Sequence, residues 1–168
     1  MRCTLVFLLF LLSLLTLSVT PCLAVKLNTP APDFTLKDLQ GGRQTLSGYK
    51  GKLVLLNFWS TNCPPCVQEL PSLNDLYKEQ KQAGLLVLGI ALDPAEKPVR
   101  ELAGKLRLEF PVVLDSNKDV YFDSYGLFGQ PVSVIIDRTG LVREKIIGAV
   151  DWNSPQSRAK IHSYLKGR

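Results

Sequence analysis

Two apolar runs with few polar interruptions dominate the middle of the chain. Residues 53–58 and residues 85–92 are rich in Leu, Val and Ile. Such runs are typical of strands that are covered on both faces. Between them, residues 67–83 place leucines on one side and lysine, glutamate and glutamine on the others. That spacing predicts an amphipathic helix, and Gly84 is a suitable stop for it.

Shorter patterns predict the remaining elements. Near the start, a glycine turn separates two short segments with strand character, and near the end the turn at residues 137–140 separates two more, so each pair is expected to form a hairpin. Ser154 is a candidate cap for a last helix, with Pro155 in its first turn. The expected strands are 31–39, 40–46, 111–114, 132–136 and 141–147, and the expected helical segments are 99–108, 120–125 and 154–165. Strands that alternate with helices, followed by a hairpin and a helix, predict an α/β sandwich with a mixed central sheet.

The first residues differ in composition from the rest. Arg2 precedes a run without charged residues that starts at Cys3 and is rich in Leu, which is the pattern of an export signal. Ala24 fits the position before a cleavage site, but an uncleaved membrane anchor and a form acylated at Cys22 also remain open. All three place the folded part outside the cytoplasm, in the periplasm. The expected division is 1–24 for the signal peptide or anchor and 25–168 for the folded domain.

The length and the charge of the chain favour a single-domain protein that does not bind nucleic acid. A chain of 168 residues, 46% of them hydrophobic, fits one domain with a continuous core. The formal net charge is +5, and removal of Arg2 with the leader leaves 19 basic and 15 acidic residues, or +4. The basic residues are scattered rather than striped, so no nucleic-acid partner is expected.

The cysteines point to chemistry at one place. Cys3 and Cys22 lie in the targeting segment, which leaves Cys63 and Cys66 for the folded domain. The pair falls between a predicted central strand and the start of a helix, where unpaired N–H groups and the helix dipole favour a thiolate. Cys63 is therefore the expected nucleophile, and Cys66, one helical turn later, can attack the resulting mixed disulfide. Two prolines between them, Pro64 and Pro65, stiffen the connection.

Two other uses of the pair compete with a redox role. A zinc site needs about four ligands, and His162 in the last predicted helix is the only histidine, so no metal is expected. A purely structural disulfide that closes so short a loop removes little entropy from the unfolded chain.

With the strand, the cysteine pair and the helix in place, the sequence resembles the thioredoxin superfamily, and within it the exported TlpA/ResA-like thiol-disulfide oxidoreductases. The resemblance extends from about Leu27 to Leu165. It is carried, beyond the cysteines, by residues 56–59 (Leu-Asn-Phe-Trp), by Pro71, by the Gly-Gln-Pro sequence at 129–131, and by residues 93–111, which are long enough for the helix and strand that this group inserts into the basic fold.

The resemblance implies roles for further residues. Pro131 is expected in the cis form, with its neighbours Gly129 and Gln130 forming a ledge on which an extended segment of a partner protein docks. Glu69 is expected to help move the proton of the second cysteine, with a raised pKa if it is partly buried. Trp59 is expected either to contact the partner, as Pro64 and Pro65 would, or simply to pack in the core.

Two positions depart from the relatives that the sequence resembles. Asn57 stands where thioredoxins proper have a buried Asp, and an amide cannot act as a base. Asn62 stands where the exported group often has a Trp immediately before the first cysteine, so an apolar lid is missing.

The expected activity is the reduction of disulfides in exported proteins, such as apocytochromes during cytochrome c maturation or proteins with copper-site cysteines. A membrane thiol-disulfide transporter is the expected electron donor, and the Cys63–Cys66 disulfide itself is the redox centre, so no cofactor is expected. A peroxiredoxin is an alternative, because residues 31–34 resemble the opening of those proteins and Ser60 fits their hydroxyl position, although Leu56 stands where they have a proline. A copper-binding or metallochaperone protein is the alternative that is not an enzyme.

Overall fold

The computed structural model describes residues 25–167. The predicted leader, with its proposed cleavage after Ala24 and the acylation candidate Cys22, lies outside the described residues. Among the described residues, no helix is both long and apolar enough to cross a membrane.

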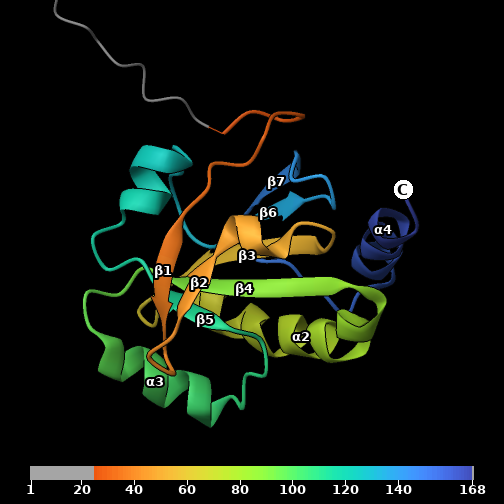
Figure 1. The fold of residues 1–168 in the computed structure, drawn as a ribbon. Coiled ribbons are helices and arrows are strands. Elements are labelled where there is room, and N and C mark those ends of the chain that lie inside the picture. Colours follow the sequence, from red (N-terminus) through yellow and green to blue (C-terminus); the bar gives the residue numbers. More distant parts are fainter. Residues whose placement is uncertain (1–24, 168) are drawn as a thin grey trace, which may run out of the picture.

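A mixed sheet of seven strands forms the centre of the molecule, in the order β2-β1-β5-β4-β3-β6-β7 (Figure 1). Its three central strands are parallel, and every pair outside them is antiparallel. The strands are β1 (Thr35–Asp38), β2 (Arg43–Thr45), β3 (Leu53–Trp59), β4 (Leu85–Ala91), β5 (Val112–Leu114), β6 (Val132–Ile136) and β7 (Val142–Ile147). The expected hairpins are confirmed as β1–β2 and β6–β7, and Gly140 has a φ of 90° in the turn of the second.

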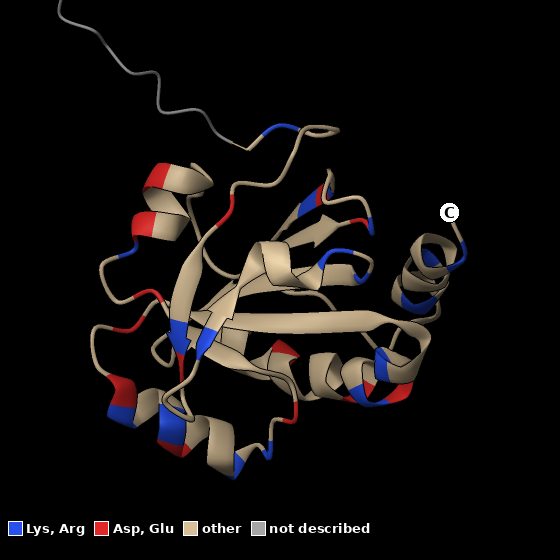
Figure 2. Cartoon of the chain, viewed as in Figure 1, with Lys and Arg blue, Asp and Glu red and all other residues tan. Residues whose placement is uncertain are grey.

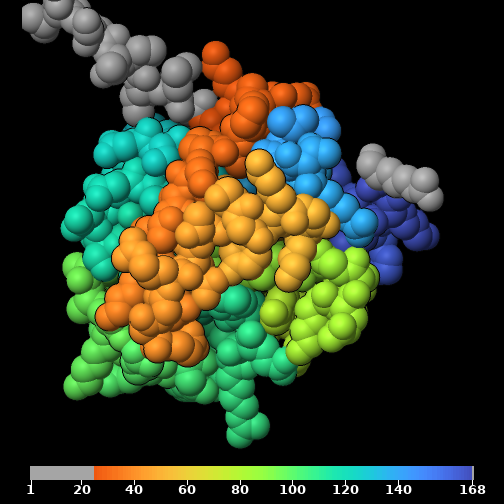
Figure 3. All heavy atoms as spheres, viewed as in Figure 1, coloured from red at the N-terminus to blue at the C-terminus, as the bar shows by residue number. Residues whose placement is uncertain are grey.

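Helical segments cover both faces of this sheet. The α-helices are α2 (Pro64–Gln80), α3 (Glu96–Lys105) and α4 (Pro155–Lys166), and shorter helical turns are η1 (Leu46–Tyr49), η2 (Lys81–Ala83) and η3 (Asp119–Ser124). Figure 1 shows α2 and α3 on one side of the sheet and η3, which carries no label, on the other. In Figure 3 the hairpin β1–β2 and the chain that leads to β3, in orange and gold, cover much of the face in view.

Two helices begin earlier than predicted. The chain enters α2 at Pro64, three residues before the expected start, because a proline in the first turn needs no N–H partner and already has a helical φ. The helix α3 spans 96–105 rather than 99–108, and it ends before Arg107, whose φ of 50° leaves the helical region. Gly84, with a φ of 102°, follows η2 as the predicted stop.

The core has two parts, one on each face of the sheet. Successive residues of β3 pack alternately into one part and the other, because side chains alternate between the two faces of a strand. Val54, Leu56 and Phe58 belong to the part that η3 covers, whereas Leu53, Leu55 and Trp59 belong to the part under α2, α3 and α4. Asn57 falls on the second face, between Leu55 and Trp59. This pattern places a polar side chain deep under the first turns of α2.

Candidate active site

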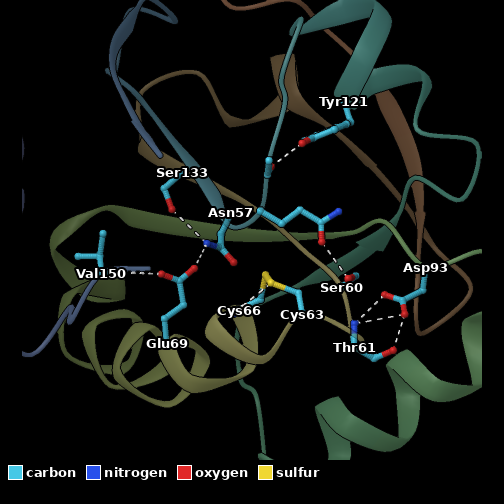
Figure 4. The surroundings of a disulfide bond; sticks show 12 residues. Asn57, Ser60, Thr61, Cys63, Cys66, Glu69, Asp93, Tyr121, Ser133 and Val150 are labelled. Carbon is cyan, nitrogen blue, oxygen red and sulfur yellow. Dashed lines mark hydrogen bonds between the residues drawn. A yellow bond between two sulfur atoms is a disulfide. The ribbon is translucent and has the colours of Figure 1, made fainter. Parts of the chain in front are cut away.

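A disulfide between Cys63 and Cys66 lies where β3 ends and α2 begins (Figure 4). Cys63 is the residue that caps the helix, with extended backbone angles, and it is half-buried. Cys66 lies in the first turn and has no exposed surface. The two sulfurs are therefore unequal, and the Cys63 sulfur is the one that a partner can reach.

The two prolines decide which donor the helix offers to this sulfur. Pro64 and Pro65 have no N–H, so the first backbone N–H of α2 is that of Cys66. It donates to the Cys63 Sγ at 3.3 Å. A negative charge on Cys63 would meet both this donor and the positive end of the helix dipole.

A buried polar cluster lies beside Cys66 on the inner side of α2. Glu69 is 4% exposed, and its Oε1 accepts a hydrogen bond from the Asn57 Nδ2 at 2.6 Å. Its Oε2 accepts one from the Val150 N–H at 2.9 Å. Burial raises the pKa of the Glu69 carboxyl above its usual value, although the bonds from Val150 and Asn57 act in the opposite direction. Figure 4 shows this carboxyl group beside the disulfide, on the side of Cys66.

Asn57 links this carboxyl group to the sheet. Its Nδ2 also donates to the Ser133 Oγ at 3.1 Å, and its Oδ1 is buried without a hydrogen-bond partner. The amide therefore supplies a donor to Glu69 and cannot itself accept a proton at neutral pH. The only ionisable group in this cluster is Glu69.

The loop before β6 lies next to the segment that leads to Cys63. The peptide bond between Gln130 and Pro131 is cis, which confirms the expectation that came from the family resemblance. The Ser60 hydroxyl donates to the Gln130 Oε1 at 2.9 Å, and the Tyr121 hydroxyl donates to the carbonyl of Gly129. The loop is thus tied both to the segment that carries Cys63 and to η3. Gly129 is exposed and Gln130 half-buried, whereas Pro131 is buried.

Trp59 does not have the exposure that contact with a partner requires. It has no exposed surface and belongs to the core under α2. Its ring lies so close to Gly89 that a Cβ there would be 3.1 Å from the indole Nε1. In this disulfide form the partner-binding role predicted for Trp59 is not available, and core packing accounts for its place.

Asp93 also belongs to the site, although it is not among the residues predicted from the sequence. Its carboxylate accepts hydrogen bonds from the Thr61 N–H, at 3.1 and 3.2 Å, and from the Thr61 hydroxyl. The bonds hold the segment before Cys63 in place. One signal was available, since Asp93 lies two residues after the end of the buried strand β4, and the carboxyl ends of parallel strands commonly carry functional groups. Ser60 directly follows the parallel strand β3 and had the same signal, whereas Tyr121 and Ser133 lacked it.

No metal centre is formed by the described part of the chain, in which no group of three or more His, Cys, Asp or Glu side chains could hold an ion. His162 lies in α4, with its Nε2 3.3 Å from the Nε2 of Gln80 near the far end of α2.

Comparisons with known proteins agree with this geometry. Residues 27–145 match the model of the AhpC/TSA family. The chain is 38% identical over 127 residues to the thiol-disulfide oxidoreductase ResA of Geobacillus kaustophilus, covering 76% of this chain and 72% of that protein. It is 34% identical over 142 residues to ResA of Bacillus anthracis, covering 84% and 78%.

Solved structures show the same fold. A putative thiol:disulfide interchange protein DsbE from Chlorobium tepidum superposes with a TM-score of 0.75 at 28% identity, covering 84% of this chain and 99% of that one. The thioredoxin domain of a thiol-disulfide oxidoreductase from Bacteroides vulgatus gives a TM-score of 0.75 at 25% identity, covering 85% and 100%.

Proposed function

Because the chain belongs to the AhpC/TSA family of thioredoxin-like proteins and is a thiol-disulfide oxidoreductase, we propose that it reduces disulfides of exported proteins through Cys63 and Cys66. One observation carries the proposal: a half-buried cysteine caps a helix, with its disulfide partner completely buried one turn later. This arrangement presents one sulfur to a partner and withholds the other for a second, internal step.

The reaction begins with both cysteines reduced. The Cys63 thiolate attacks one sulfur of the substrate disulfide, a bond forms between them, and the other substrate sulfur leaves as a thiolate that takes up a proton. The Cys66 thiolate then attacks the Cys63 sulfur. The second substrate sulfur leaves as a thiolate that takes up a proton, and the Cys63–Cys66 disulfide of this structure results. Two electrons pass from the protein to the substrate.

In this proposal Glu69 takes the proton of Cys66 in the second step. Cys66 is completely buried, so water has poor access to its thiol. A carboxyl group with a raised pKa is closer in proton affinity to a thiol than an ordinary carboxylate is, which favours transfer between them. Asn57 and Val150 orient the carboxyl group for this transfer.

The substrate is a protein segment in extended form. Gly129 and Gln130 present exposed and half-buried surface beside the disulfide, and a backbone ledge of this kind can pair with an extended peptide. We place the reaction outside the cytoplasm, in the periplasm, because of the leader pattern in residues 1–24. We further propose that its substrates include proteins of cytochrome c maturation. A membrane thiol-disulfide transporter would then supply the electrons that reduce Cys63 and Cys66 again.

The reduction potential of the Cys63–Cys66 pair tests the direction of electron flow. The full-length chain is equilibrated with defined thiol buffers, and the fraction with free thiols is measured. A dedicated reductant is expected to have a potential below about −220 mV, whereas a potential near about −120 mV would make the protein an oxidant and contradict the proposal.

The order of the two steps has its own test. The Cys66→Ser variant, reduced and mixed with a disulfide-bonded protein, should accumulate a mixed disulfide through Cys63, because nothing remains to release it. The Cys63→Ser variant is the matched control and should trap none. Equal trapping by both variants would refute the assignment of Cys63 as the nucleophile.

A further inference from the structure

Two phenylalanine rings are exposed together beside residues 129–131, the loop before β6 that we call the docking loop. Phe128 is 73% exposed and Phe122 is 40% exposed, and their ring centroids are 6.0 Å apart. Single exposed apolar residues are common, but neighbouring ones that form a patch usually mark a binding surface. We call these two residues the phenylalanine pair.

Contacts connect the phenylalanine pair to the disulfide. Phe128 directly precedes Gly129, whose carbonyl accepts the hydrogen bond from the buried Tyr121 (Figure 4). The Tyr121 ring packs edge to face against the ring of Phe122, with centroids 4.8 Å apart. The next residue in the loop, Gln130, is bonded to Ser60 close to Cys63. An extended segment lying along Gly129 and Gln130 would therefore bring a side chain within reach of the pair.

Two acidic side chains of η3 lie beside the pair. Lys118 directly precedes η3, and no other Lys or Arg occurs before Arg138. Asp119 and Asp123, both exposed, stand in η3 on either side of the pair's Phe122. Figure 2 shows η3 with acidic positions only, although the formal net charge of the whole chain is +5. The apolar pair thus has an acidic margin formed by Asp119 and Asp123, with Lys118 at the start of the same helical segment.

We propose that the phenylalanine pair binds a bulky apolar side chain carried next to the reactive cysteine of a protein substrate, and that Asp119 and Asp123 favour a basic residue near it. This substrate preference rests on the proposed disulfide reductase activity. A substrate segment is the occupant because the pair continues the docking loop. A second copy of the chain, related by two-fold symmetry, would instead bring the acidic margins of both copies together.

The test uses two peptides that differ at one position. Each carries a single cysteine in mixed disulfide with glutathione and one lysine, and the residue beside the cysteine is Phe in one peptide and Ser in the other. The full-length protein, reduced beforehand, converts each peptide to its thiol and releases glutathione while its own disulfide forms. The quantity measured is the ratio of the two second-order rate constants in a single turnover.

The wild-type protein is expected to react at least about fivefold faster with the Phe peptide, since burial of one ring has that order of effect. In Phe128→Ser this ratio should fall below about twofold. Leu27→Ser is the matched control, because Leu27 is 54% exposed but lies in the N-terminal segment, outside the docking loop. It should keep the ratio of the wild-type protein.

Charge is tested by exchanging the lysine of the Phe peptide for glutamate. The wild-type protein should prefer the lysine peptide, less so as salt is added, and the double variant Asp119→Asn, Asp123→Asn should lose the preference. A ratio near one between the Phe and Ser peptides, or a ratio that survives Phe128→Ser, would overturn the apolar part of the proposal.

Oxidised glutathione separates this failure from a failure of the activity itself. If the reduced wild-type protein reduces oxidised glutathione but does not distinguish the peptides, the phenylalanine pair has no role in selection. If it reduces neither the peptides nor oxidised glutathione, the reductase function is wrong, and the substrate preference falls with it.

Discussion

Burial changes what Glu69 can do at the scale of a single residue. An exposed helical glutamate would be ionised at neutral pH and would contribute little beyond surface charge. Here the side chain is 4% exposed and accepts hydrogen bonds from a side chain of β3 and from the backbone N–H of Val150. The cost of burying a charge raises its pKa, and the two donors offset only part of that cost.

The raised pKa of Glu69 predicts a pH dependence of stability in the disulfide form. At low pH the carboxyl group is protonated in both the folded and the unfolded protein. As the pH rises through the usual value of 4.5, the unfolded protein loses this proton first, so the free energy of unfolding falls until the raised pKa is passed. Each unit by which the pKa is raised corresponds to about 1.4 kcal/mol. Denaturant unfolding across this pH range measures the effect.

Glu69→Gln should remove the fall in the free energy of unfolding that Glu69 causes as the pH rises. The glutamine oxygen can still accept from Val150, and its NH₂ can donate to the Asn57 Oδ1 after the Asn57 amide turns over, which gives that oxygen the partner it lacks. Glu101→Gln, an exposed position in α3, is the control and should behave as the wild-type protein. If Glu69→Gln and the wild-type protein keep a constant difference in stability from pH 4 to pH 8, the raised pKa is refuted.

At the scale of an element, the first turns of α2 and α4 are capped in the same way. Both α2 and α4 begin with proline in the first turn, preceded by a residue whose side chain accepts a backbone N–H. In α4 the acceptor is the Ser154 Oγ, which receives the Ser157 N–H at 3.3 Å. In α2 the acceptor is the Cys63 sulfur. Both first turns thus combine a proline with a side-chain acceptor three residues before the donor, and in α2 that acceptor is a redox-active sulfur.

Ser154→Ala should lower the free energy of unfolding by about 1 kcal/mol, because the first turn of α4 loses its side-chain acceptor. Chemical denaturation measures the change. Ser163→Ala is the matched control inside the same helix, where the exposed hydroxyl only bonds the carbonyl of Lys160, and it should change stability by less than about 0.5 kcal/mol. Equal losses in the two variants would show that the cap has no special role.

At the scale of the whole molecule, the side chain of Arg138 connects the sheet to two helical segments. Arg138, in the turn between β6 and β7, donates to the carbonyl of Ala83 at 3.3 Å and to the carbonyl of Leu165 at 3.1 Å. These carbonyls end the helical segments η2 and α4, where a positive charge is also favoured by the helix dipole. One exposed arginine thus ties the end of the sheet opposite the disulfide to two helices.

Arg138→Met should lower the free energy of unfolding by about 1 kcal/mol and increase hydrogen exchange in the last turn of α4. Arg138→Lys keeps the charge but lacks the planar fork that serves two carbonyls, so it should fall between that variant and the wild-type protein. An unchanged exchange rate in α4 for Arg138→Met would show that the contact does not hold this helix.

The sequence by itself determined the elements and the chemistry that local patterns encode. Continuous apolar runs placed β3 and β4, the turn with Gly140 placed the last hairpin, and the spacing of Cys63 and Cys66 after a strand indicated a redox pair. These features depend on residues that are neighbours in the chain, so their physical causes can be read along it.

The tertiary structure alone decided which distant residues meet. The Val150 N–H donates a hydrogen bond to Glu69, which is 81 residues away in the sequence. The Ser60 hydroxyl donates one to Gln130, which is 70 residues away. Trp59 is buried and Phe128 exposed, although both are aromatic residues near the same site. No local pattern separates such cases, because burial and long-range hydrogen bonds depend on how the strands pair and what packs on each face of the sheet.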